Sequence, residues 1–200
     1  MPACPVGTIV RLEKLREGIA FCRECGMDTL QLRLGDAVLL SRETISAAGA
    51  LLRTFHAASA VAGVSGEQVW DFQKGPSTVG LGNAELRTER TKSLMRAAEV
   101  CDRLGIPAAM AHLGFVPEDP ADPDYAVYVE ALIRIGRRYG ELGVRFLLET
   151  GQETPETLLR LIEDAGEKAV GVNLDPANLV MYGRGSPLDA APRAARSSGK

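Results

Sequence analysis

The chain has 200 residues, 46% of them hydrophobic, and a formal net charge of −3 from 23 Lys and Arg against 26 Asp and Glu. This apolar content is typical of one domain with a sizeable core. The cationic residues form no basic stretch, which disfavours nucleic acid as a partner, and no run of about 18 apolar residues predicts a membrane span. The N-terminus lacks the pattern of a signal peptide, so a cytoplasmic location is expected.

Strand and helix patterns alternate from the first residues, which predicts a parallel α/β sheet. Helices are expected near 12–26, 41–54, 84–104, 124–142 and 154–165, and strands near 6–10, 29–34, 57–62, 107–113, 144–149 and 169–174. Two long connections, 63–82 and 114–123, follow strand carboxyl ends, where α/β folds place ligand-binding loops. Small and basic residues without an apolar period predict a disordered tail over 190–200, because Pro192 opposes a helix that begins before it.

Cys22 and Cys25 form a C-x-x-C motif inside the first predicted helix. The sequence contains no second C-x-x-C, and its two histidines are far away along the chain. Two helical thiols packed against the sheet are therefore favoured over a metal or redox site.

The connection after the third predicted strand, 63–82, contains Trp70, the only tryptophan, in a segment rich in Gly and Ser. An indole ring in such a loop is suited to stacking on the apolar face of a sugar or to closing a lid. Trp70 is equally suited to fixing the long loop to the body of the fold.

Two apolar runs that end in a carboxylate, 144–149 and 170–175, flank the last predicted helix. A right-handed crossover places such strands parallel and usually adjacent, about 5 Å apart. We therefore expect Glu149 and Asp175 to face one point. Two neighbouring carboxylates repel each other unless a proton or a cation lies between them, and oxygen ligands suit magnesium, manganese, cobalt or zinc.

Three segments, 111–120 (AHLGFVPEDP), 149–155 (ETGQETP) and 173–179 (NLDPANL), together resemble the xylose isomerase-like TIM-barrel family, and within it the sugar phosphate isomerases/epimerases. The resemblance covers about residues 5–190, with its motifs in the family's order. It implies a (β/α)8 barrel with one divalent metal at its carboxyl end. The implied reaction moves a proton on the carbon next to a carbonyl of a sugar or sugar phosphate.

The resemblance also implies roles for individual residues. Glu149 would bind the metal and transfer protons, Asp175 would be the second metal ligand, and Glu153 would bind a substrate hydroxyl. His112 would line the same cavity, unless it is a histidine satisfied by hydrogen bonds within the barrel. Asn178 stands where some epimerases of the family carry a histidine, so it can hydrogen-bond substrate but cannot exchange a proton.

A closed barrel of this type needs about 250 residues. The sequence predicts about six of the eight strands, so we expect an incomplete, C-terminally truncated barrel over residues 1–189. The family's seventh-strand histidine and eighth-strand glutamate would be missing. The divalent metal would then be weakly held and the activity weak or lost, while the open sheet edges favour a homo-oligomer.

Two other functions compete with the isomerase or epimerase. One is a non-catalytic fragment or a sugar-binding and interaction module. The other is the endonuclease-four type of phosphodiesterase, which needs a histidine-rich zinc cluster; His56 and His112 are the only histidines, and the charge balance is acidic. This composition disfavours the endonuclease.

Overall fold

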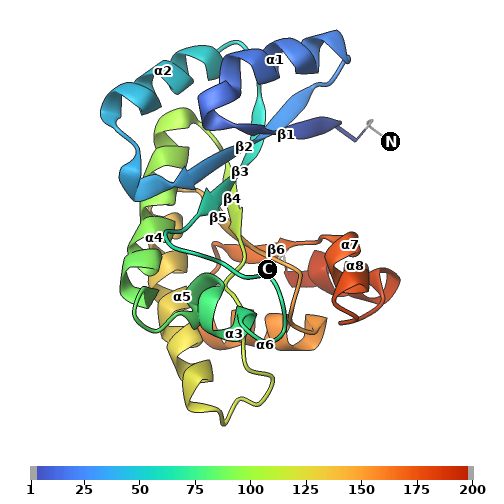
Figure 1. Ribbon diagram of the computed structural model, residues 1–200. Helices are drawn as coiled ribbons and strands as arrows, with labels where there is room; N and C mark the ends of the chain where they lie inside the picture. Colours follow the sequence, from blue (N-terminus) through green and yellow to red (C-terminus); the bar gives the residue numbers. More distant parts are fainter. Residues whose placement is uncertain (1–3, 198–200) are drawn as a thin grey trace.

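Six parallel strands form one sheet in the order β1-β2-β3-β4-β5-β6, so each strand pairs with its neighbours in the sequence. The computed structural model describes residues 4–197. Its strands are β1 (Gly7–Arg11), β2 (Thr29–Asp36), β3 (Ala57–Gly63), β4 (Ala108–Ala111), β5 (Arg145–Glu149) and β6 (Val170–Asn173). The sheet curves, with helices along its outer side and the edge strands β1 and β6 lying apart (Figure 1). The predicted strands and their parallel arrangement are confirmed.

The helices are α1 (Leu15–Glu24), α2 (Arg42–Leu52), α3 (Gly75–Thr78), α4 (Arg87–Leu104), α5 (Pro123–Glu141), α6 (Pro155–Ala165), α7 (Pro176–Met181) and α8 (Pro187–Ser197). Five of them, α1, α2, α4, α5 and α6, follow the strands as the sequence predicts, whereas α3, α7 and α8 were not predicted. Short 3-10 turns, η1 (Leu12–Lys14), η2 (Ala37–Leu39) and η3 (Gly80–Gly82), link some of them. Within residues 4–197, no helix combines the length and apolar content that a bilayer crossing requires.

Local chemistry sets the limits of α6, the helix that joins the two acidic strands. Thr154 caps its N-terminus, where the side-chain oxygen accepts a hydrogen bond from the Thr157 N–H at 3.3 Å, and Pro155 occupies the first helical position. Gly166 ends it at φ 65°, a left-handed conformation that costs glycine little. The sequence encodes both ends of this crossover without tertiary help.

The core lies between the sheet and the outer helices. Leu32 and Phe146 from the strands and Leu94 and Ile135 from the helices are fully buried there. Tyr139 of α5 packs against Phe146 of β5, with ring centroids 4.9 Å apart. The burial of these side chains holds α4 and α5 against the strands, so the positions of the strand ends are well fixed.

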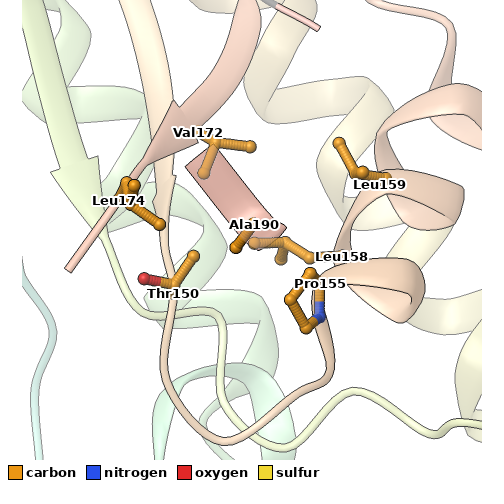
Figure 2. A pocket seen from close by; sticks show the side chains of 7 residues that line it. All are labelled: Thr150, Pro155, Leu158, Leu159, Val172, Leu174 and Ala190. Atoms are coloured by element: carbon orange, nitrogen blue, oxygen red, sulfur yellow. The ribbon is translucent and has the colours of Figure 1, made fainter. Parts of the chain in front are cut away.

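Helix α8 corrects the predicted disordered tail over 190–197, while residues 198–200 lie outside the described part of the chain. Ala190 of α8 is only 3% exposed. It helps close a small apolar cavity of about 10 Å³ (Figure 2), lined also by Thr150, Pro155, Leu158, Leu159, Val172 and Leu174. Pro192 lies inside the helix and removes one backbone donor. Packing against α6 and β6, which the linear pattern does not display, offsets that loss.

The C-x-x-C motif divides between two environments. Cys22 is buried, but Cys25 is exposed just after α1 ends, and neither forms a disulfide within the described residues. The expectation that both thiols pack against the sheet is wrong for Cys25, because the helix stops before its next inward-facing position.

Candidate functional site at the carboxyl ends of β4, β5 and β6

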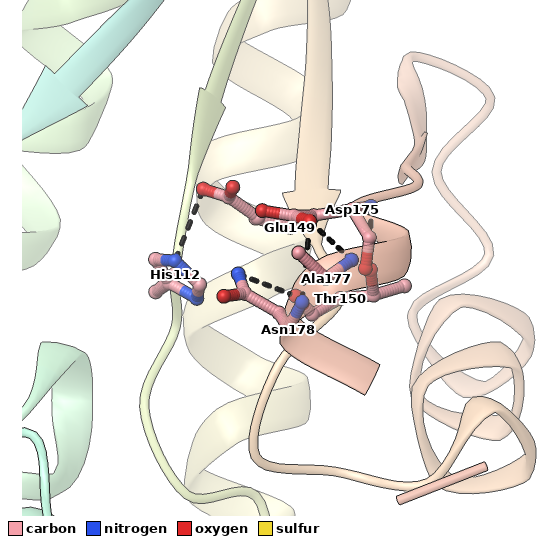
Figure 3. A network of polar contacts seen from close by, with 6 residues as sticks. All are labelled: His112, Glu149, Thr150, Asp175, Ala177 and Asn178. Atoms are coloured by element: carbon pink, nitrogen blue, oxygen red, sulfur yellow. Dashed lines mark hydrogen bonds and ion pairs between the residues drawn. The ribbon is translucent and has the colours of Figure 1, made fainter. Parts of the chain in front are cut away.

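Three neighbouring strands deliver the predicted acidic and imidazole groups to one end of the sheet. His112 directly follows β4, Glu149 is the last residue of β5, and Asp175 lies two residues beyond β6. The register pairs Glu149 with Asn173, so the ends of β5 and β6 are level. Figure 3 shows the three side chains on the same side of these strand ends. The expected adjacency of the two acidic strands is therefore present.

His112 and Glu149 form an ion pair or charge-assisted hydrogen bond. The Nε2 atom of His112 lies 3.0 Å from Oε2 of Glu149, and the two side chains are only 19% and 13% exposed (Figure 3). Nε2–H therefore donates to the carboxylate. The other ring nitrogen, Nδ1, is buried without a partner among the described residues. His112 is thus not a histidine fully satisfied within the fold.

Asp175 begins α7 and is held by the backbone N–H groups of that helix on one side and by the Thr150 hydroxyl on the other. Its Oδ1 accepts hydrogen bonds from the Ala177 N–H at 2.8 Å and the Asn178 N–H at 3.2 Å. The Thr150 hydroxyl accepts from the Asp175 N–H at 2.7 Å and donates to the Asp175 carbonyl at 3.1 Å. These contacts position the carboxylate, although one of its oxygens is already used as a helix cap.

Asn178, expected to contact substrate, joins α7 to the segment after β5. Its Nδ2 donates to the Thr150 carbonyl at 3.1 Å (Figure 3). The amide therefore bridges α7 and the segment after β5. Its side-chain oxygen remains as a polar group in the same region.

Glu153 is a buried carboxyl group with an unusual proton affinity. Only 5% of the residue is exposed, and Oε1 accepts a long hydrogen bond of 3.5 Å from the Val116 N–H. Burial raises the pKa of Glu153 to about 7, although its own backbone N–H and the charge of His112 oppose the rise. A carboxyl group with such a pKa exists in both protonation states near neutrality, as general acids and bases require.

Two further buried polar residues were missed by the sequence analysis. Gln152 is 2% exposed, and both its amide nitrogen and its amide oxygen lack a partner among residues 4–197. The hydroxyl of Tyr128, on α5, is also buried and unpaired, and burial together with the charge of Glu153 raises the Tyr128 pKa. Gln152 adjoins Glu153 in the sequence, which was the only available signal. Unpaired buried groups of this kind call for a ligand, an ion or water.

The connection after β3 brings Trp70 to this site. The rings of Trp70 and His112 meet edge to face, with centroids 4.9 Å apart, and Trp70 remains 44% exposed. Phe72 packs against Phe115 and Tyr182, both with centroids 5.8 Å away. The connection is thus anchored by aromatic contacts and also presents the indole beside the His112 imidazole.

Arg90 of α4 holds that connection in place through hydrogen bonds from its buried guanidinium group. The residue is fully buried, and desolvation lowers the pKa of its guanidinium, which nevertheless stays charged. It donates hydrogen bonds to four carbonyls of the connection, those of Ser65, Glu67, Thr78 and Gly80. The sequence analysis missed this role, because a helical arginine between polar neighbours is normally on the surface.

Few side chains in this region could bind a metal ion. Among the described residues, no cluster of three or more His, Cys, Asp or Glu has metal-binding geometry. Glu149 and Asp175 supply two carboxylates, and hard cations such as magnesium or manganese commonly bind through one or two carboxylates and keep several waters. Zinc takes three or four protein ligands, which is more than these two residues supply.

The chain is similar to a known protein family and to several solved structures. The sequence model of the xylose isomerase-like TIM barrel matches residues 19–198. A xylose isomerase domain protein from Planctomyces limnophilus is 29% identical, with a TM-score of 0.88 over 98% of this chain and 72% of that one. A 3-keto-D-glucoside 4-epimerase from E. coli is 16% identical, with a TM-score of 0.71 over 98% of this chain and 77% of that one.

One curated sequence also matches part of the chain. The β subunit of phenylalanine–tRNA ligase from Clostridium tetani is 34% identical over 94 residues, which span 47% of this chain but only 12% of that protein. A match to so small a part of the ligase carries no activity over to this chain.

Proposed function

This chain belongs to the xylose isomerase-like TIM-barrel family, and from that premise we propose that it acts on a sugar or sugar phosphate as an isomerase or epimerase. The reaction would transfer a proton at the carbon next to a carbonyl. The observation that carries the proposal is the 3.0 Å contact between His112 and Glu149 at the carboxyl end of β5. The name of the E. coli relative, a 4-epimerase of a 3-keto-glucoside, describes inversion at a carbon of this kind.

Glu149 is the proposed base. Its carboxylate would accept the proton from the carbon beside the carbonyl and, in an isomerisation, return it to the neighbouring carbon; inversion in an epimerisation would need a second donor on the opposite face of the sugar. His112 would hold that carboxylate through Nε2–H, which fixes its orientation and lowers the entropy lost when substrate binds. Trp70, in contact with the imidazole ring, would cover the apolar face of the sugar.

Glu153 is the proposed partner of a substrate hydroxyl. Because its pKa is raised to about 7, it can donate a hydrogen bond when protonated and accept one when ionised. Gln152 is the next residue in the chain, and its buried, unpaired amide offers both a donor and an acceptor. Buried polar groups that await partners favour a polyhydroxylated ligand over an apolar one.

Glu149 and Asp175 would hold a divalent cation, with water and substrate oxygens completing its coordination. Bound there, the cation would polarise the substrate oxygens and stabilise the negative charge that develops as the proton leaves. Two protein carboxylates imply weak binding, and so we expect exchange to be slow and to need excess magnesium or manganese.

The test is solvent isotope exchange. The protein is incubated in D2O with MnCl2 and a panel of ketohexoses, ketohexose phosphates and 3-keto-glucosides, and deuterium in the recovered sugar is measured by mass spectrometry. We expect incorporation with the parent chain and none with Glu149→Gln. The matched control is Glu163→Gln, which removes an exposed carboxylate from α6. Incorporation by Glu149→Gln at the parent rate would exclude Glu149 as the base.

Thermal unfolding separates the cation from the chemistry. MnCl2 should raise the unfolding temperature of the parent chain but not of Asp175→Asn, which keeps the helix cap and removes the charge. Sugar binding without deuterium incorporation would instead support the sugar-binding module. No MnCl2 effect on the parent would contradict metal dependence.

A further inference from the structure

A cationic groove lies on the outer helical layer, away from the proposed sugar site. It is a cavity of about 360 Å³ lined by Val38, Lys92, Met95, Arg96, Glu99, Arg134 and Arg138. None of these residues is among those that form the site at the strand ends, and the charged ones lie on α4 and α5. The groove is therefore separate from the site at the strand ends.

Two pairs of cations face each other across this groove. Lys92 and Arg96 are one turn apart on α4, and Arg134 and Arg138 are one turn apart on α5. Glu99 is the single carboxylate of the lining and Glu141 pairs with Arg138 at 3.0 Å, so four positive and two negative side chains leave an excess of two positive charges. The cluster cannot be recognised in the sequence, because the cations of α4 and those of α5 are about 40 residues apart in a chain of net charge −3.

Glu99 orients two of the cations and leaves the others uncompensated. It accepts hydrogen bonds from Arg96 and, at 2.8 Å, from Nη2 of Arg138. Lys92 and Arg134 are exposed, and neither has an ion pair within residues 4–197. Like charges one turn apart on a helix destabilise it by a few tenths of a kcal/mol, so this arrangement is unfavourable without a counter-charge.

We propose that the groove binds a phosphate monoester. Arginine guanidinium groups match phosphate oxygens in geometry and charge, and a concave surface lined by one sign of charge concentrates the opposite sign. The volume lies in the range of small-molecule sites. Met95 and Val38, the latter 51% exposed, supply apolar surface for the organic part of the ester.

The test is calorimetric titration of the full chain with phenyl phosphate, and separately with inorganic phosphate and with sulfate, at matched ionic strength. We expect saturable binding of one phenyl phosphate per chain, tighter than binding of either inorganic anion. The Lys92→Ala/Arg134→Ala double variant should bind phenyl phosphate at least ~10-fold more weakly, because two charge-assisted contacts are lost.

A matched double variant removes the same charge elsewhere. Arg103→Ala/Lys168→Ala deletes two exposed cations outside the groove and should bind like the parent. Without phosphate, the groove variant should unfold at a temperature no lower than the parent, because repulsion is relieved and no ion pair is broken. Equal phenyl phosphate affinity in the two double variants, or no binding above the sulfate background, overturns the proposal.

Discussion

His112 donates its Nε2–H to Oε2 of Glu149 across 3.0 Å, which joins the residue after β4 to the last residue of β5. Gly151 lies against the other side of the imidazole ring. A Cβ atom at residue 151 would stand 3.2 Å from both Cε1 and Nδ1 of His112. The small residue therefore makes room for the ring in the orientation that reaches Glu149.

Gly151→Ala should displace the His112 ring and weaken its bond to Glu149, at a cost of about 1–3 kcal/mol of stability for overpacking. The check is the ring-nitrogen chemical shifts, which NMR resolves easily because the chain has only two histidines. We expect the His112 shifts to change and those of His56, immediately before β3, to stay constant. Unchanged His112 shifts would show that the ring tolerates the methyl group.

Glu153→Gln should change the pH dependence of stability. Burial raises the pKa of Glu153 from 4.5 to about 7, so the folded state binds more protons than the unfolded state between these values. Stability from this group therefore falls as pH rises through that window. Glutamine does not titrate and so has no such loss. At 1.36 kcal/mol per pKa unit, the variant's free energy of unfolding should exceed that of the parent by about 3 kcal/mol at pH 8.

Urea denaturation of both chains at pH 5 and pH 8 measures this difference. The variant should match the parent more closely at pH 5 and exceed it clearly at pH 8. Glu163→Gln, on the exposed face of α6, should shift stability equally at both values. A pH-independent difference between Glu153→Gln and the parent would mean that the carboxyl group is already ionised at pH 5.

Arg90→Lys should loosen the connection between β3 and α4. Lysine keeps the charge but cannot reach four carbonyls with one compact ammonium group, and a broken buried network of this kind costs about 3 kcal/mol. Trp70, the only tryptophan, reports the change. We expect red-shifted emission and stronger acrylamide quenching at temperatures where the chain is still folded. Arg103→Lys, on the exposed side of α4, is the control and should leave the emission unchanged.

Thr150→Val should remove the hydrogen bonds that hold the Asp175 backbone in place. Valine matches threonine in shape but leaves the Asp175 N–H and carbonyl without the partners now 2.7 and 3.1 Å away, a loss of about 2 kcal/mol. Amide hydrogen exchange at Asp175 should accelerate, and the stabilisation by MnCl2 should shrink. Thr150→Ser keeps the hydroxyl and should preserve both properties. Equal exchange in the two variants would contradict a positioning role for the hydroxyl.

Several features of the site follow from local patterns. The apolar runs that end at Glu149 and Asp175, with a capped helix between them, predict two adjacent parallel strands because a right-handed crossover leaves little alternative. His112, directly after a short buried strand and before a glycine, is likewise predictable as a residue at the strand ends. The same reasoning failed for residues 190–197, where burial of Ala190 against α6 and β6 sustains a helix that composition alone disfavours.

Local patterns along the chain predict the order of the strands and of the helices α1, α2, α4, α5 and α6, and the end of the sheet at which the acidic groups lie, because periodicity, caps and crossover handedness act over short stretches of chain. The burial of Arg90, the raised pKa of Glu153 and the meeting of two cationic helix faces arise only when the chain is folded. Each of these depends on desolvation or contact between residues distant in the chain, which no local pattern encodes.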